Sequence, residues 1–242
     1  MPERPGDSEP PSAPERPERP EDSEDSEPAL GWCAREVEQE FPELRLLLAQ
    51  VRVGRPGSLT DGSTPAVEDR LRELSNRLRG AWAVGVRGEP VPAAYRVFFR
   101  QIGLDPEVLR TPIEAAALER MLRGGFISAG LLEDVLLISL VDTSVPVWAL
   151  DADCVDGPVG IRQSKEGEPL GRSAGASSLP AGRLVIADAS AALAVLFGEP
   201  APGHGAGAGT RHLTLFAVGV AGVPALYVEE ALWTCRTALE QQ

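Results

Sequence analysis

The sequence predicts an α+β fold, on two observations. Segments in the first half of the chain repeat apolar residues every three or four positions, which is the spacing of an amphipathic helix. Later segments are short β-prone runs separated by glycine, proline and aspartate. Because runs of helices followed by runs of strands are typical of α+β proteins, we expect a helical first half packed on a sheet-rich second half.

Residues 1–28 differ sharply from the rest of the 242-residue chain. They hold ten acidic residues and three arginines, with proline or serine every few positions. Such a segment cannot bury enough apolar surface to offset the entropy of ordering it. We therefore expect a disordered acidic tail at 1–28 and a single domain at 29–242.

The composition excludes several classes of protein. The net charge of -13 argues against a general affinity for polyanions, although a local basic patch is compatible with it. The sequence has no signal-peptide core and no apolar run of about 20 residues, so we expect a cytoplasmic protein without a membrane segment. With two histidines and three scattered cysteines, we expect reduced thiols, no metal site and no cofactor.

Before residue 90 the sequence predicts both helices and strands. Val37 and Trp32 are expected to face inward from a short helix, and Pro65 and Gly80 mark the start and the stop of a longer one. The expected elements are a helix at 30–40, a buried strand at 41–53, a helix at 64–79 and a short strand at 81–86.

The stretch AAYRVFFRQIGLDP, residues 93–106, predicts a helix with one apolar face. Arg96 and Arg100 share the neighbouring stripe, and Gly103 is expected to cap the helix in the left-handed conformation. The residues of the apolar face are Tyr95, Phe98, Phe99 and Ile102. Two interpretations of the arginine pair stay open: either they point at an anionic group, or they are solvated or paired with nearby acids.

The remaining elements follow from capping signals and short apolar runs. TPIE at 111–114 predicts a capping box that opens a helix ending at Arg123, and 131–140 is expected to be a buried helix. Strands are expected within 145–153, 157–171, 183–197 and 212–222, and a helix packed on the sheet within 224–242. The glycine-rich segment around His204 predicts a flexible hairpin connection, and 162–170 a charged turn.

Four segments, in their order and spacing, resemble the B3/B4 domain of the bacterial phenylalanyl-tRNA synthetase beta subunit and its freestanding relatives. They are AAYRVFFRQIGLDP, VPVWALDADCVDG, RQSKEGEPL and RLVIADASAALA, and the resemblance covers about residues 35–220. In the synthetase this domain hydrolyses tyrosine wrongly attached to phenylalanine tRNA. The resemblance implies a pocket between the helical and the sheet-rich parts.

The resemblance also implies which residues line that pocket, and here the chain departs from the family pattern. Trp148 stands where the synthetase domain has a pocket histidine, and Phe216 where it has a pocket glutamate. Asp134 is retained, but Leu137 replaces an asparagine. The pocket candidates are therefore Asp134, Trp148 and Phe216, and no catalytic residue is identified.

Two hypotheses about function follow. In the first, the chain binds tRNA or an aminoacyl-tRNA end and hydrolyses the ester in trans with a degenerate pocket; the binding candidates are Arg96, Arg100, Arg162 and Glu168. In the second, the chain keeps only the fold and is a non-catalytic module for a small amino-acid-like ligand or a protein partner. The lost polar residues and the acidic balance motivate this second hypothesis, which is the alternative to the first.

Overall fold

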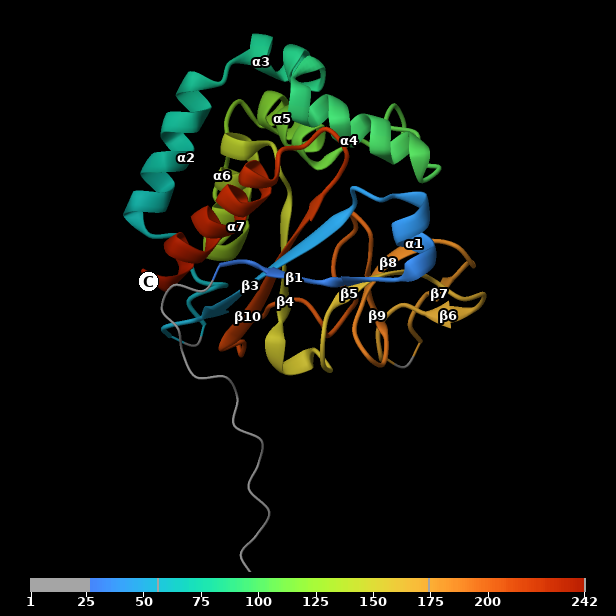
Figure 1. The fold of residues 1–242 in the computed structure, drawn as a ribbon. Helices are drawn as coiled ribbons and strands as arrows, with labels where there is room; N and C mark the ends of the chain where they lie inside the picture. The colour runs from blue at the N-terminus through green and yellow to red at the C-terminus, as the bar shows by residue number, and fades with distance from the viewer. Residues whose placement is uncertain (1–26, 56, 174, 242) are drawn as a thin grey trace, which may run out of the picture.

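The computed structural model describes residues 27–55, 57–173 and 175–241, so all but two residues of the expected acidic tail lie outside it. The fold is α+β, as the sequence predicts (Figure 1). A helical layer lies over a central four-stranded sheet, and a second four-stranded sheet lies beside it (Figure 1).

The central sheet has the strand order β1-β3-β10-β4. Its strands are β1 (Ala29–Leu30), β3 (Arg45–Arg52), β4 (Val147–Asp151) and β10 (His212–Gly219). β10 pairs antiparallel with β3 on one side and with β4 on the other, so that Phe216 lies opposite both Leu48 and Trp148. Every side chain of β10 after His212 is buried, which makes this strand the centre of the core.

The second sheet has the order β2-β5-β8-β9. Its strands are β2 (Trp32–Cys33), β5 (Gly160–Gln163), β8 (Leu184–Ala187) and β9 (Ala192–Val195), and a two-stranded ribbon is formed by β6 (Glu168–Pro169) and β7 (Ser178–Leu179). The short helix α1 (Arg35–Glu40) packs against β5.

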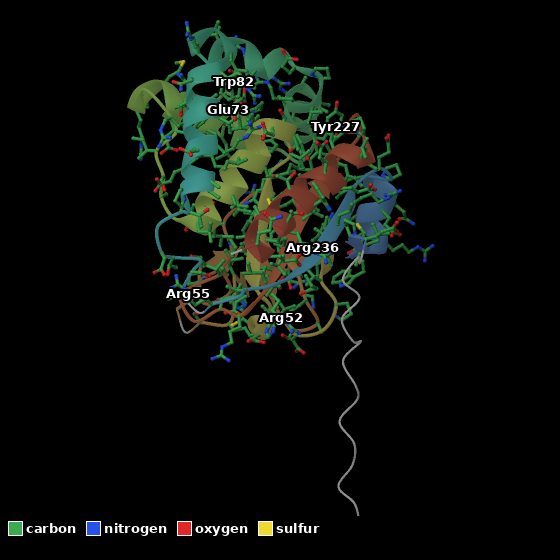
Figure 2. All side chains as sticks on the ribbon, turned by 90° about the vertical axis from the view of Figure 1, so that its left-hand side faces the viewer. Arg52, Arg55, Glu73, Trp82, Tyr227 and Arg236 are labelled. Carbon is green, nitrogen blue, oxygen red and sulfur yellow. The ribbon has the colours of Figure 1, made fainter. Side chains whose placement is uncertain are left out.

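The helical layer contains α2 (Pro65–Arg77), α3 (Gly80–Gly85), α4 (Pro90–Gln101), α5 (Pro112–Arg123), α6 (Leu131–Thr143) and α7 (Ala225–Glu240), with the 3-10 turns η1 (Val86–Gly88) and η2 (Ala152–Cys154). α7 packs on β3 and β10, as expected of the C-terminal helix, and α6 packs on α7. Trp82 of α3 lies at the top of the molecule and Arg52 at the opposite end (Figure 2). No helix among the described residues is long and apolar enough to cross a membrane.

Three sequence predictions need correction. Residues 81–86, expected to be a strand, fall in α3 and η1. Residues 30–40 form parts of two strands before α1 begins, and Trp32 is 36% exposed, although Val37 is fully buried as expected. The glycine-rich segment is not a hairpin, because it joins β9 and β10, which belong to different sheets. β3 is a further departure, since this strand from the first half lies inside the central sheet.

Candidate functional site

The two pocket candidates Trp148 and Phe216 are adjacent strand residues whose rings stack. They lie opposite each other on β4 and β10, with ring centroids 5.5 Å apart and an interplanar angle of 15°. Trp148 is 8% exposed and Phe216 1% exposed. The resemblance to the B3/B4 domain assigns these two residues to one pocket. The structure also brings them together, but as part of the packed core.

Phe197, which follows β9, completes this packing and was not predicted. Its ring centroid lies 4.9 Å from that of Phe99, 5.8 Å from Tyr95 and 5.9 Å from Trp148. Its backbone has a φ of 63°, the left-handed region that a bulky residue rarely adopts. The segment FGEP gives a turn signal at this position, but the direction of the ring depends on the left-handed backbone and on partners from distant segments.

We use the name aromatic block for the residues Tyr95, Phe98, Phe99, Trp148, Phe197 and Phe216. Its polar groups are the indole nitrogen of Trp148 and the Tyr95 hydroxyl, which donates to the carbonyl oxygen of Val218 at 2.7 Å. Burial raises the pKa of the Tyr95 phenol, so this group stays neutral. The aromatic block thus consists of apolar ring surface, the indole N–H donor of Trp148 and a Tyr95 hydroxyl already bonded to Val218.

Asp134, the third pocket candidate, is a buried carboxylate whose hydrogen bonds hold neighbouring loops in place. It accepts from the hydroxyls of Ser63 and Ser128 and, at 2.9 Å, from the backbone nitrogen of Ala129. These contacts hold two loops against the first turn of α6. The hydrogen bonds of Asp134 thus go to Ser63, Ser128 and Ala129, whereas Trp148 and Phe216 contact each other through their rings.

Arg96 and Arg100, the two arginines of α4, have different environments. Arg96 is 8% exposed and forms ion pairs with Glu107 and Glu114. Burial opposes the charge of Arg96, but the two carboxylates outweigh it and raise the pKa of the guanidinium. Arg100 has a side chain that is 55% exposed and lies 4.0 Å from Glu107. The interpretation as pairing with nearby acids therefore holds for Arg96, and Arg100 remains accessible.

Glu114 explains why Arg96 is held so firmly. Its second oxygen accepts from the Thr111 hydroxyl at 2.7 Å and from the Thr111 backbone nitrogen at 3.1 Å, forming the predicted capping box of α5. One carboxylate thus joins the arginine of α4 to the first turn of α5.

Arg162 and Glu168 are also paired with each other. Two hydrogen bonds join the guanidinium to the carboxylate, one of them 2.9 Å long, and Lys165 donates its backbone nitrogen to Glu168 at 2.9 Å. The bond from Arg162 is the main reason that the pKa of Glu168 lies below its ordinary value. Both side chains are mostly buried, so the two residues order the turn that leads into β6.

A polar cluster that the sequence did not reveal gathers at the end of the second sheet. Arg172 pairs with Asp188 and donates to the carbonyl oxygen of Cys154 at 2.8 Å. His204 is 4% exposed, and its Nδ1 lies 3.2 Å from both the Cys154 oxygen and Arg172 Nη1. His204 is therefore packed against its neighbours, in contrast to the flexible position predicted for it.

The helical layer carries a surface hollow of about 310 Å³ beside Arg96. Arg87 and Arg110 also line it, together with Val84, Leu118 and Met121. Both arginines are exposed, and neither has an ion pair or hydrogen bond to another described residue. The hollow is thus lined by Arg87 and Arg110, by apolar side chains, and by Glu107 and Glu114, which pair with Arg96. In the described ranges, no three His, Cys, Asp or Glu side chains gather where they could hold a metal ion.

Comparison with known proteins shows local similarity to one enzyme subunit. A segment of 99 residues is 37% identical to the phenylalanine–tRNA ligase beta subunit of Xanthomonas oryzae pv. oryzae, which covers 40% of this chain and 12% of that subunit. A segment of 94 residues is 34% identical to the beta subunit of Xanthomonas axonopodis pv. citri, covering 38% of this chain and 12% of the subunit. No family model matches the chain. Part of this chain is thus similar to a small part, about a tenth, of the beta subunits that it matches.

Proposed function

We propose that the chain is a phenylalanine–tRNA ligase beta-like domain that binds an aminoacyl-tRNA or its aminoacyl end without hydrolysing it. The aromatic block is the observation that carries this proposal. Its members Trp148 and Phe216 stand where the B3/B4 pattern has a pocket histidine and a pocket glutamate, and Phe197 packs against Trp148. The local similarity to the ligase beta subunit supports the tRNA-related part.

Loss of hydrolysis follows from the chemistry of the block. Hydrolysis of an ester requires a positioned water, a group that accepts its proton, and donors for the developing oxyanion. The hydroxyl of Tyr95 is committed to Val218, and because its raised pKa keeps the phenol protonated, it does not act as a general base. Discrimination of tyrosine from phenylalanine also needs polar partners for the substrate hydroxyl, which aromatic carbon does not supply.

The arginine-lined hollow is the surface we assign to RNA phosphate. Arg87 and Arg110 form no ion pair with another described residue, whereas Glu107 and Glu114, which also line the hollow, pair with Arg96. Exposed arginines bind phosphate bidentately and release counterions from the nucleic acid. Because the chain as a whole is acidic, binding depends on this local patch, and we expect a weak, salt-sensitive complex.

The first test is filter binding of bulk tRNA to the full chain at several salt concentrations. The double variant Arg87→Ala/Arg110→Ala should bind about tenfold more weakly at low salt, and the slope of log K against log salt should fall by roughly 1.5, because two phosphate contacts are lost. The matched control is Arg35→Ala/Arg211→Ala, which removes two exposed arginines from other parts of the molecule. Equal weakening in both double variants would assign the effect to net charge and contradict the hollow as the binding surface.

The second test is a deacylation time course with tRNA mischarged with tyrosine. The rate with the full chain should equal the spontaneous rate. Acceleration above that rate would show that ester hydrolysis survives without the histidine and the glutamate, and would overturn the non-catalytic assignment.

The second candidate is a small-molecule or protein-binding module that keeps only the fold. The net charge of -13 favours it, since an acidic protein meets tRNA at an electrostatic disadvantage. Absence of tRNA binding at low salt would select this candidate over the first.

A further inference from the structure

Helix α7 carries exposed apolar side chains on the side that faces away from the central sheet. Leu226 is 70% exposed, Trp233 66% and Tyr227 42%, and no other described tryptophan is as exposed as Trp233. Leu226 and Trp233 are seven residues apart, so they lie on one stripe of the helix. Figure 2 shows Tyr227 toward one end of α7 and Arg236 toward the other. Since tryptophan and tyrosine are enriched among the residues that dominate protein interfaces, this stripe has the composition of a contact surface.

Leu30 of β1 extends this surface. It is 68% exposed and lies opposite Leu47 of β3. Leu47 shares one face of the strand with Arg45, which lies opposite Gly219. A Cβ on Gly219 would stand 3.4 Å from Val228 of α7, so Leu30 and α7 lie on the same face of the central sheet. We use the name α7 face for Leu30, Leu226, Tyr227 and Trp233.

The charges along α7 differ between its two halves, and this indicates what covers the α7 face. Glu229 and Glu230 are exposed in the N-terminal half, whereas Arg236 lies in the C-terminal half and pairs with Glu240 at 2.9 Å. In a second copy that crosses antiparallel at Trp233, Glu230 meets Arg236, because each is three residues from Trp233. A parallel copy would set each glutamate against its own counterpart, and it would also align the two helix dipoles unfavourably.

We propose that the α7 face binds the α7 face of a second copy of this chain, with the two helices antiparallel about a two-fold axis at Trp233. Such an interface is isologous, so each contact between the copies occurs twice. The two Trp233 rings pack against each other at the axis, and Glu230 of each copy pairs with the partner's Arg236. This inference does not depend on tRNA binding, and α7 lies outside the residues that resemble the B3/B4 domain.

The size of the α7 face sets the expected strength of the dimer. A helix of 16 residues is about 24 Å long and roughly 10 Å across. One such face is well below the roughly 800 Å² that each subunit buries in a standard interface. We therefore expect reversible association with a Kd on the order of 10–100 µM, so that the chain is a monomer when dilute and a dimer when concentrated.

Sedimentation equilibrium of the full chain from about 1 to 300 µM tests the proposal. The mass should rise with concentration from that of one 25.7 kDa chain toward that of two. Trp233→Ala should weaken the association about tenfold, and because this side chain is mostly exposed, the change leaves the core intact. Leu122→Ala removes apolar surface from a 78% exposed side chain on α5 and should associate as the unaltered chain does. A monomer mass at every concentration, or equal effects of the two variants, would overturn the proposal.

Charge reversal tests the antiparallel arrangement. Glu230→Arg should weaken association about tenfold, because it sets two cations opposite each other. Adding Arg236→Glu to the same chain should restore the association, since each pair then has opposite charges again. Glu43→Arg changes the net charge equally at an exposed residue elsewhere and should have a much smaller effect. Equal weakening by Glu43→Arg, or no recovery in the double variant, would contradict the pairing of Glu230 with the partner's Arg236.

Discussion

Asp188 shows at the residue scale how a turn residue is fixed by its charge. Its carboxylate has no exposed surface, pairs with Arg172 and accepts from the backbone nitrogens of Asp156, Ser190 and Ala191 at 2.7–2.9 Å. Burial raises the pKa of a carboxyl, but these donors outweigh it and lower the pKa of Asp188 to about 2. Asp188 lies in the segment RLVIADASAALA, one of the four that carry the resemblance, but the arginine that pairs with it comes from another loop.

Asp188→Asn should therefore lower the free energy of unfolding at pH 7 by about 2 kcal/mol, since the pKa falls from 3.8 to about 2. The folded pKa lies below the unfolded one, so this stabilisation is present above about pH 4 and is lost as the pH falls toward 2. Urea unfolding at pH 7, 4 and 3 measures it. Asp156→Asn changes an exposed side chain nearby and serves as the control. A difference between Asp188→Asn and the unaltered chain that stays constant down to pH 3 would show that the charge is not its source.

At the candidate site, Phe197 is the residue whose role could not be predicted from the sequence. Trp148 and Phe216 could be found from the resemblance, because they occupy aligned positions on strands. Phe197 could not, because its φ of 63° depends on packing against rings contributed by α4 and β4. A left-handed bulky residue costs about 1–2 kcal/mol, which the four ring contacts offset.

At the scale of elements, the ion pair of Arg96 with Glu114 joins α4 to the start of α5. Arg96→Ala should lower the free energy of unfolding by about 3 kcal/mol, because it leaves the 10% exposed side chain of Glu114 without its cation. Arg100→Ala on the same helix should change it by less than about 0.5 kcal/mol, because that side chain is solvated. Urea unfolding of the two variants measures the contrast. Equal effects would mean that the arginines contribute only helix propensity.

The wrong prediction of a strand at residues 81–86 also has its cause at the scale of elements. A short apolar run fits a strand and a helical turn equally well. The helix is selected by tertiary packing: Trp82 contacts Phe126 edge to face at 6.4 Å, and Val86, four residues on, is 2% exposed, while Val84 is 71% exposed. A strand would place Trp82, Val84 and Val86 on one face of the sheet, so all three would have similar exposure. The capping box at Thr111 was predictable because its signal lies within four consecutive residues.

At the scale of the whole molecule, the α+β class could be read from the order of periodic segments, but the pairing of strands could not. The central sheet joins segments from opposite ends of the chain, and Thr214 donates to Gln50, 164 residues earlier. No local pattern states which distant strand is the partner. The strand at 41–53 and the helix within 224–242 were predicted, but not that β3 pairs with β10 in the central sheet.

A chain that ends at residue 211 should therefore fail to fold. It lacks α7 and β10, and β10 lies between β3 and β4 with almost every side chain buried. We expect no cooperative thermal transition and rapid proteolysis, whereas a control chain ending at Glu240 should retain both elements and behave like the full chain. A cooperative transition in the shorter chain would show that the remaining elements form a core of their own.

The position of β10 in the sequence also has a consequence for synthesis in the cell. At about 5–20 residues per second, β3 leaves the ribosome roughly 10–30 s before the strand that pairs with it has been made. During that interval the apolar side chains of Leu46, Ala49 and Val51 have no sheet to enter. The time for which β3 is exposed to chaperones and to aggregation is then set by how fast the segment between β3 and β10 is translated, rather than by the stability of the finished fold.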